Sequence, residues 1–222
     1  MGKLTLYGID GSPPVRSVLL TLNALGLPFE YKVINLFGGD HLKPEFLKMN
    51  PLHTVPTLDD DGFYLYDSHA INAYLVAKYG KNDKESLYPK DLQQRAIVDQ
   101  RLHYDSSVFG STARAITFPL IRENQTEIAQ AKIDALSGVY ETLNLFLKST
   151  DYLAGNNLTI ADFSVIAVLS GMVVFLEVDA RKFPNLAGWV QRIKKLPYYE
   201  EANGSKVTQF TDFLKSKNFT IV

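Results

Sequence analysis

The stretch Thr54-Val-Pro-Thr-Leu-Asp-Asp-Asp-Gly-Phe-Tyr-Leu-Tyr-Asp-Ser68 carries the densest structural signals in the chain. Its apolar and β-branched residues fall in two short runs, Thr54–Leu58 and Phe63–Tyr66, each typical of a strand. The acidic segment Asp59–Gly62 between them ends in glycine, the residue that tight turns favour. The sequence therefore predicts an antiparallel hairpin centred near residue 60.

Strand and helix signals alternate on both sides of this hairpin. Upstream we expect a strand at Leu4–Ile9, a helix from Pro14 to Leu25 ended by Gly26, a strand at Phe29–Ile34, and a short helix at residues 44–48. Downstream, Asp67-Ser68 predicts a helix start with Ser68 as the N-cap, and Gly80 predicts its end. The order strand-helix-strand-helix-strand-strand-helix favours a mixed sheet with right-handed crossovers.

The composition changes after this first part. Residues 82–90 are polar and non-periodic, which is typical of a linker. Everything beyond them has helical spacing, and two apolar stripes stand out: Ile128, Ala131, Ala135, Val139, Leu143, Phe146 and Leu147, then Leu186, Trp189, Val190 and Ile193. We predict an α/β domain at residues 1–81, a linker at 82–90 and an all-α domain at 91–222.

Leu158–Leu176 is apolar nearly all round and is long enough, as a helix, to cross a bilayer. A buried central helix is the better interpretation, because Asp162, Ser164 and Ser170 interrupt the run and no basic flank marks an orientation. Thr159 and Asp162 have the spacing of a capping box, which predicts that a helix begins directly after Thr159.

Composition excludes several kinds of chemistry. The 222 residues include no cysteine, so the chain has no thiol nucleophile, no CxxC redox pair and no cysteine-ligated metal. A net charge of −1 gives no support to nucleic-acid binding. The first residues lack a basic segment followed by an apolar run, so we expect a cytoplasmic protein without a secretory signal.

Three places could hold a ligand with anionic groups. Ser12 lies between a predicted strand and a predicted helix, where a hydroxyl and the helix N-terminus both stabilise an anion, although Gly-Ser-Pro-Pro is also ordinary turn chemistry. A cis bond between Val55 and Pro56 would free the Val55 backbone to pair with an extended peptide-like ligand. Asp67 and Ser68 open a second helix, where plain capping is the simpler interpretation.

The histidines give a weaker signal. His41 and His53 both fall in loops beside the first two features, which favours a role in binding a carboxylate, although loop histidines are often solvated bystanders. The chain has no H-E-x-x-H motif and no close cluster of His, Asp and Glu, so we expect no metal site. It also has no G-x-G-x-x-G or Walker motif, so nucleotide binding has no support.

Together these segments resemble the cytosolic glutathione transferases over essentially the whole chain, and within them the insect delta and epsilon classes, epsilon more than delta. The residues that carry the resemblance are Ser12-Pro-Pro-Val-Arg16, Asn50-Pro-Leu-His-Thr-Val-Pro-Thr57, Asp67-Ser-His-Ala-Ile71 and Leu158-Thr-Ile-Ala-Asp162. The resemblance implies a thioredoxin-like N-terminal domain, an all-helical C-terminal domain, a homodimer, and glutathione as a co-substrate with no other cofactor.

The resemblance also implies roles for individual residues. Ser12 would hydrogen-bond the glutathione sulfur, and the remaining glutathione-binding residues would be His41, His53, Thr54, Val55, Pro56, Asp67, Ser68, His69 and Arg114. Between the domains we expect an apolar pocket for small electrophiles, lined by Leu36, Phe109, Ala115, Phe118, Leu120 and Phe210. Phe118-Pro119 would end or kink a helix there.

Two functions remain open from the sequence. The first is a glutathione S-transferase that conjugates apolar electrophiles, with peroxidase or dehydrohalogenase side activities as in the wider family. The second is a non-catalytic protein on the same scaffold that binds glutathione or apolar ligands. Ser12, His53, Val55-Pro56 and Asp67-Ser68 are all present, which favours the enzyme. A glutaredoxin-like redox enzyme is excluded because it would need a cysteine.

Overall fold

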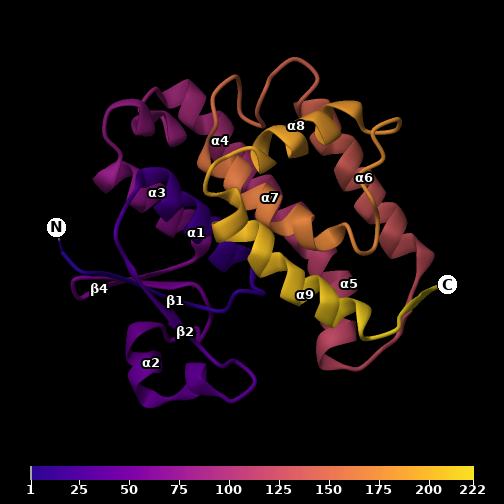
Figure 1. Cartoon of the computed structure of the whole chain (residues 1–222), viewed down its shortest axis with the longest axis horizontal. Coiled ribbons are helices and arrows are strands. Elements are labelled where there is room, and N and C mark those ends of the chain that lie inside the picture. The colour runs from indigo at the N-terminus through magenta and orange to yellow at the C-terminus, as the bar shows by residue number, and fades with distance from the viewer. Residues whose placement is uncertain (1) are drawn as a thin grey trace.

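The computed structural model describes residues 2–222, and it has a sheet-containing part beside a larger helical part (Figure 1). The sheet has the strand order β2-β1-β3-β4. Its strands are β1 (Leu4–Gly8), β2 (Glu30–Val33), β3 (Thr57–Asp60) and β4 (Phe63–Tyr66). The helices of this part are α1 (Pro13–Leu25), α2 (Pro44–Met49) and α3 (Ser68–Tyr79).

The sheet is mixed, as predicted. Strand β2 runs parallel to β1, whereas β3 is antiparallel to both β1 and β4. The hairpin turns on Asp61 and Gly62, with φ of 54° and 90°. Two successive residues with positive φ give the turn a twist that matches the strands, and glycine reaches that region without a steric penalty.

Six helices make up most of the second part: α4 (Leu92–Tyr104), α5 (Gly110–Arg122), α6 (Gln130–Phe146), α7 (Ile160–Met172), α8 (Pro184–Lys194) and α9 (Ser205–Lys215). Single π turns η3 (Asp105–Phe109) and η4 (Glu200–Gly204) join α4 to α5 and α8 to α9, whereas the 3₁₀ segments η1 (Asp40–Leu42) and η2 (Asn82–Leu87) precede α2 and α4. The expectation of helix alone was incomplete, because β5 (Glu127–Ile128) and β6 (Thr220–Ile221) pair in parallel.

Helix α7 is the centre of the molecule, and all thirteen of its residues are buried. The predicted capping box forms between Thr159 and Asp162. The Asp162 carboxylate also accepts hydrogen bonds from the Leu153 N–H and the Trp189 indole N–H, both at 2.9 Å. Within residues 2–222, no helix is both long and apolar enough to cross a membrane.

Helix α1 joins the two parts by packing against α3 on one side and α7 on the other. Its Arg16 is fully buried, and one guanidinium nitrogen donates to Asn203 Oδ1 at 2.6 Å and to Ser170 Oγ at 2.9 Å. No carboxylate lies within ion-pairing distance of this guanidinium among the described residues. Burial lowers the pKa of Arg16 to about 10.

Two predictions about where β3 and α3 begin were wrong. Strand β3 begins at Thr57, after the Val55-Pro56 bond, rather than at Thr54. The N-cap of α3 is Asp67 and not Ser68, because the Asp67 carboxylate reaches two backbone N–H groups of the first turn. The end of α3 at Gly80 is as predicted; its φ is −63°, and a Cβ there would meet the Val76 carbonyl oxygen at 2.5 Å.

The apolar stripe of α6 was also displaced. Ala131 and Ala135 are exposed, and Ile128 lies in β5 rather than in the helix. The buried face of α6 consists of Ile133, Leu136, Val139, Tyr140 and Leu143. These side chains bury far more apolar area than alanine does, so they and not the alanines decide which side faces the core.

Pro119 does not end α5, which continues to Arg122. A proline has no N–H to donate four residues back, so the Ala115 carbonyl loses its normal helical partner. The Lys132 ammonium of α6 donates to that carbonyl at 2.8 Å. The side chain therefore replaces the missing backbone donor, and the helix passes through the proline.

Candidate functional site

One edge of the sheet gathers the predicted ligand-binding segments. Tyr7 of β1 is aligned with Thr57 of β3, which is aligned with Tyr66 of β4, and Gly8 is aligned with Val33 of β2. The end of β1, the end of β2, the start of β3 and the end of β4 therefore meet at this edge. The segments that extend from it are residues 9–12, 34–43, 50–56 and 67–69.

Ser12 is the N-cap of α1 and has an extended backbone. Its hydroxyl makes no capping hydrogen bond, and its side chain is partly exposed. Pro13 and Pro14, the first helical residues, have no N–H to offer, so Val15 provides the first free backbone donor of the helix. A ligand anion at this end would meet one hydroxyl, one N–H and the positive end of the helix dipole.

The loop before β3 is built on the buried Asn50. Its side-chain amide donates to the Thr54 carbonyl and to the hydroxyls of Thr54 and Thr57 at 3.0 to 3.1 Å. The Val55–Pro56 bond is cis, as considered from the sequence. Within residues 2–222 neither the N–H nor the C=O of Val55 is hydrogen-bonded, so both can pair with a ligand backbone.

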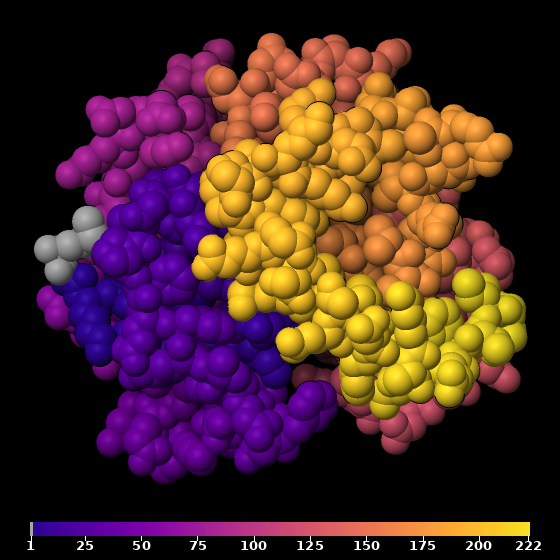
Figure 2. Space-filling view, viewed as in Figure 1, coloured from indigo at the N-terminus to yellow at the C-terminus, as the bar shows by residue number. Residues whose placement is uncertain are grey.

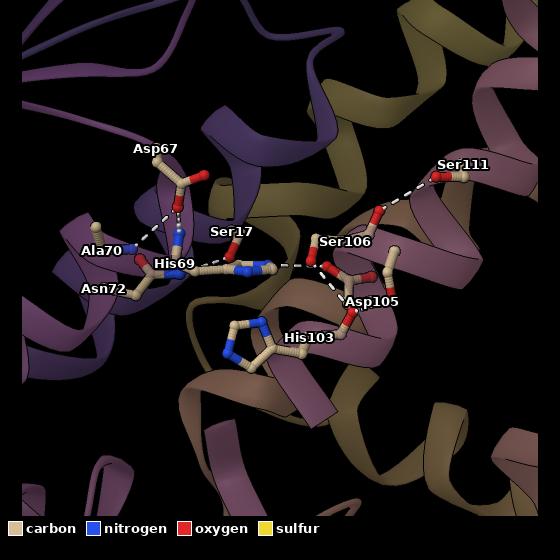
Figure 3. Close-up of polar contacts among 10 residues, drawn as sticks. Ser17, Asp67, His69, Ala70, Asn72, His103, Asp105, Ser106 and Ser111 are labelled. Carbon is tan, nitrogen blue, oxygen red and sulfur yellow. Dashed lines mark hydrogen bonds and ion pairs between the residues drawn. The ribbon is translucent and has the colours of Figure 1, made fainter. Parts of the chain in front are cut away.

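The start of α3 leaves several polar groups free. One Asp67 oxygen, Oδ1, accepts from the backbone N–H groups of His69 and Ala70 at 2.9 and 3.1 Å (Figure 3). Asp67 itself has a φ of 77°, which turns the chain into the helix. The second Asp67 oxygen and the Ser68 N–H have no partner among the described residues, so they can receive a ligand ammonium and a ligand carboxylate.

The His69 side chain connects the two parts of the molecule. Its Nε2 lies 3.0 Å from Asp105 Oδ2, and Figure 3 shows the imidazole extended from α3 toward the η3 turn that holds this carboxylate. The Asp105 side chain is only 7% exposed, and its other oxygen has no hydrogen-bonding partner among residues 2–222. His69 is therefore oriented by the helical part.

His41 and His53 lie together at the same edge, with ring centroids 5.9 Å apart. The Nδ1 of His41 is buried and has no partner within the described chain. His53 has a φ of 46°, and its N–H donates to the Asn50 carbonyl at 3.0 Å. The geometry thus brings two imidazoles side by side where the sequence suggested a carboxylate site.

The residues predicted for an apolar pocket fall into two groups. Phe109 and Leu120 are buried in the core at 0% and 1% exposure, so they support packing rather than offering a surface. Leu36, Ala115, Phe118 and Phe210 have accessible side chains. Phe210 of α9 lies against Gly11, next to Ser12, with ring atoms 3.4 Å from the position of a Cβ there.

Arg114 lies on α5, outside the segments that extend from the sheet edge. It is exposed on α5, and its guanidinium donates to Ser111 Oγ of the same helix at 3.3 Å. As for metals, no group of three His, Asp or Glu side chains in the described part of the chain could hold an ion.

The sequence analysis gave no role to five polar residues of this region. Asn50 holds the loop before β3, Asp105 faces His69, and Asp10 accepts hydrogen bonds from Tyr31 and Lys206. Asp10 and Lys206 are 196 residues apart in the sequence, and His69 and Asp105 are 36 apart. A single sequence carries no signal for such pairs, whereas the polar Asn50 beside Pro51 could have been taken as a turn former.

Comparison with known proteins agrees with this geometry. Residues 6–83 match the family model described as glutathione S-transferase, N-terminal domain, and residues 97–197 match the glutathione S-transferase, C-terminal domain. Glutathione S-transferase 1 of Manduca sexta is 41% identical over 96% of this chain and 98% of its own length. The chain belongs to the glutathione S-transferase family.

Solved structures place it more closely within the glutathione S-transferases. An epsilon-class enzyme of the housefly, Musca domestica, is 55% identical with a TM-score of 0.96, and the match covers 99% of this chain and all of the other. A glutathione transferase homologue of Drosophila mojavensis, solved with bound glutathione, is 49% identical with a TM-score of 0.92 over both full chains. These matches confirm the thioredoxin-like and helical fold and the resemblance to the epsilon class.

Proposed function

We propose that this chain is a glutathione S-transferase that activates the glutathione thiol at Ser12 and joins it to small apolar electrophiles. The single observation that carries this assignment of Ser12 is its free hydroxyl at the N-terminus of α1, on the sheet edge where the other polar groups gather. Family membership supports glutathione as the substrate. The non-catalytic alternative is not favoured, because named glutathione S-transferases are similar over nearly the whole chain.

The chemistry needs a thiolate, because the thiol itself is a poor nucleophile. A free thiol has a pKa near 8.5, so only a few per cent is ionised at pH 7. The Ser12 hydroxyl donates to the sulfur and stabilises its anionic form more than its neutral form. One charge-assisted hydrogen bond contributes about 1.5–3 kcal/mol, which lowers a pKa by roughly one to two units.

The other segments of the edge hold the tripeptide in an extended form. The Val55 N–H and C=O pair with the cysteinyl backbone, and Thr54 and Pro56 shape the loop that presents them. The unpaired Asp67 oxygen and the Ser68 N–H receive the ammonium and carboxylate of the γ-glutamyl unit. His41 and His53 receive the glycyl carboxylate, for which the unpartnered Nδ1 of His41 is suited.

The electrophile approaches the sulfur from the side of the helical part. Phe210, which lies against Gly11 beside Ser12, forms one wall of this approach, and Leu36, Ala115 and Phe118 are further accessible apolar side chains. Such a surface has few polar groups to fix one orientation, so it accepts a range of apolar compounds. The reaction is a direct attack by the thiolate, aided by proximity, with no intermediate bound covalently to the protein.

The proposal extends to organisation and location. Residues 1–81 form the glutathione-binding domain and residues 91–222 the helical domain, which is supported by the end of α3 at Tyr79 and the start of α4 at Leu92. The enzyme acts as a homodimer in the cytoplasm, an assignment that rests on family membership. Light scattering on the purified protein tests the dimer by its mass.

Turnover of glutathione with chlorodinitrobenzene, with glutathione binding measured by calorimetry, tests the function. Wild type should turn over only when glutathione is present. Ser12→Ala should lower kcat/KM about 10- to 100-fold, the value of one charge-assisted hydrogen bond, and should move the pH profile to higher pH.

Glutathione should still bind to Ser12→Ala, because the hydroxyl stabilises the thiolate more than the bound tripeptide. Ser149→Ala, a change at an exposed loop serine, should match wild type. Unchanged turnover and an unchanged pH profile in Ser12→Ala would refute the role of Ser12. Glutathione binding without turnover of chlorodinitrobenzene or a hydroperoxide by wild type would instead establish the non-catalytic alternative.

A further inference from the structure

The C-terminal segment lies across the boundary between the two parts of the molecule. In Figure 2, the yellow α9 region extends from the indigo surface of the N-terminal part over the helical part. Two polar contacts of this segment with the N-terminal part differ in burial. The first is the buried contact of Asn203, in η4, with Arg16.

The second contact is made by three side chains that we call the α9 tether: Asp10, Tyr31 and Lys206. Asp10 Oδ1 accepts from the Tyr31 hydroxyl at 2.9 Å and from the Lys206 ammonium at 3.1 Å. The ammonium also lies 5.4 Å from the centre of the Tyr31 ring. The side chains of Lys206 and Asp10 are 22% and 29% exposed, so water and salt reach this ion pair.

The tether lies one helical turn from Phe210. Residues four apart on a helix share a face, so Lys206 and Phe210 point the same way from α9. Phe210 packs against Gly11 on one side and Gly171 of α7 on the other, with ring atoms 3.4 Å from the Cβ position of each. Asp10 and Gly11 are consecutive residues of the loop that ends in Ser12. The ion pair and the aromatic contact therefore hold the same few residues of α9 against the same loop.

We propose that Lys206 is a positioning residue that, through Asp10 and Tyr31, holds Phe210 over the Ser12 loop and so limits the size of the electrophile that reaches the sulfur. The expected effect on substrates rests on the proposed function, whereas the contacts of the α9 tether are observed in the structure. Because the ion pair is partly exposed, it contributes only a small free energy to the docking of α9. Phe210 can therefore move when the pair is broken.

Lys206→Met tests the tether, because methionine keeps much of the apolar stem and removes the charge. We expect the kcat/KM ratio of a bulky to a small electrophile to rise about two- to fivefold, the range for a partly exposed ion pair, with the KM for glutathione unchanged. Lys206→Arg should restore the wild-type ratio. Lys215→Met, at the far end of the same helix, is the matched control and should leave the ratio unchanged.

Hydrogen exchange of the α9 amides supplies a readout that does not depend on activity. The amides of α9 should exchange about two- to fivefold faster in Lys206→Met than in wild type, and 1 M NaCl should speed exchange in wild type but not further in the variant. Exchange in Lys206→Met equal to that in Lys215→Met would overturn the tether.

The two readouts separate the possible failures. Faster exchange of α9 with an unchanged substrate ratio would refute the control of electrophile size. A wild-type protein that binds glutathione but turns nothing over would refute the proposed function, while the exchange experiment would still decide whether Lys206 holds α9.

Discussion

The N-termini of α1 and α7 use their capping groups in opposite ways. At α7, the Asp162 carboxylate is fully buried and both of its oxygens accept hydrogen bonds from the protein. At α1, Ser12 is partly exposed, and its hydroxyl makes no hydrogen bond within the cap. The comparison teaches that a cap satisfied by its own chain serves folding, whereas a cap left open can serve a ligand.

Helix α3 lies between these two cases. One oxygen of Asp67 caps the helix by accepting from two backbone N–H groups, and the other oxygen has no partner in the described chain. The same side chain can therefore stabilise the helix and bind a ligand. The three helix starts rank from closed to open as α7, α3 and α1, and substitutions should shift from stability effects to activity effects in that order.

The largest effect on stability is expected from Asp162→Ala. This change leaves three buried N–H donors without their acceptor, those of the Thr159 and Leu153 backbones and the Trp189 indole, and it also removes the acceptor of the Thr159 hydroxyl. Each unsatisfied buried donor costs about 1–3 kcal/mol, so we expect the free energy of unfolding to fall by at least about 3 kcal/mol. Urea denaturation of the variant and of wild type measures the difference.

Ser12→Ala is the counterpart at the open cap. Its free energy of unfolding should stay within about 0.5 kcal/mol of wild type, because the hydroxyl makes no cap hydrogen bond that could be lost. If the two substitutions destabilised the protein equally, the distinction between a closed and an open cap would be wrong.

A smaller effect separates the two roles of Asp67. Asp67→Ala removes the cap and places alanine at a φ of 77°, so it should cost about 1–2 kcal/mol of stability. Asp67→Asn keeps an oxygen acceptor and a side chain that tolerates positive φ, so its stability should change by less than about 0.5 kcal/mol. Both variants lack the negative charge and should raise the KM for glutathione severalfold.

Denaturation and steady-state kinetics on the same preparations check this separation. Asp67→Asn with wild-type stability but weakened glutathione binding would support the double role. An Asn variant with an unchanged KM would show that the second oxygen does not receive the ligand ammonium.

Much of this fold could be predicted from the sequence, because local chemistry decided it. The Asp61-Gly62 turn, the proline start of α1 and the capping box of α7 each involve residues only a few positions apart. The site edge was foreseeable for the same reason, since Ser12 and Asp67 follow predicted strands and Val55 lies near the start of another. Errors arose where a neighbour decided the outcome, as when Asp67 and not Ser68 capped α3.

The rest depended on partners that are distant in the sequence. Helix α5 continues through Pro119, and the Lys132 ammonium donates to the Ala115 carbonyl that the proline leaves without its helical donor. Rules based on neighbouring residues could not predict this contact. In the same way, only the packing of α9 on the N-terminal part shows that Asp10 faces Lys206. Contacts of this kind follow from the whole fold, so they become visible only once the elements are placed.

The smallest predicted effect concerns the surroundings of the closed cap. The Tyr198 ring packs edge-on against Phe163 in the first turn of α7, with ring centroids 6.2 Å apart. Burial raises the pKa of Tyr198 to about 12. The unfolded chain ionises this phenol near pH 10 while the folded protein keeps it protonated, so the unfolded state binds fewer protons between these values. The free energy of unfolding should therefore be unaffected by this phenol below pH 10 and should fall as the pH rises toward 12.

Tyr198→Phe removes this contribution without removing the ring. The free energy of unfolding at pH 7 should stay within about 0.5 kcal/mol of wild type, and its decline between pH 10 and pH 12 should be shallower. Urea denaturation at several pH values measures both, with Tyr64→Phe on the exposed face of β4 as the control. Parallel pH curves for wild type and Tyr198→Phe would mean that water reaches the phenol freely, and the start of α7 would then be less closed than its hydrogen bonds indicate.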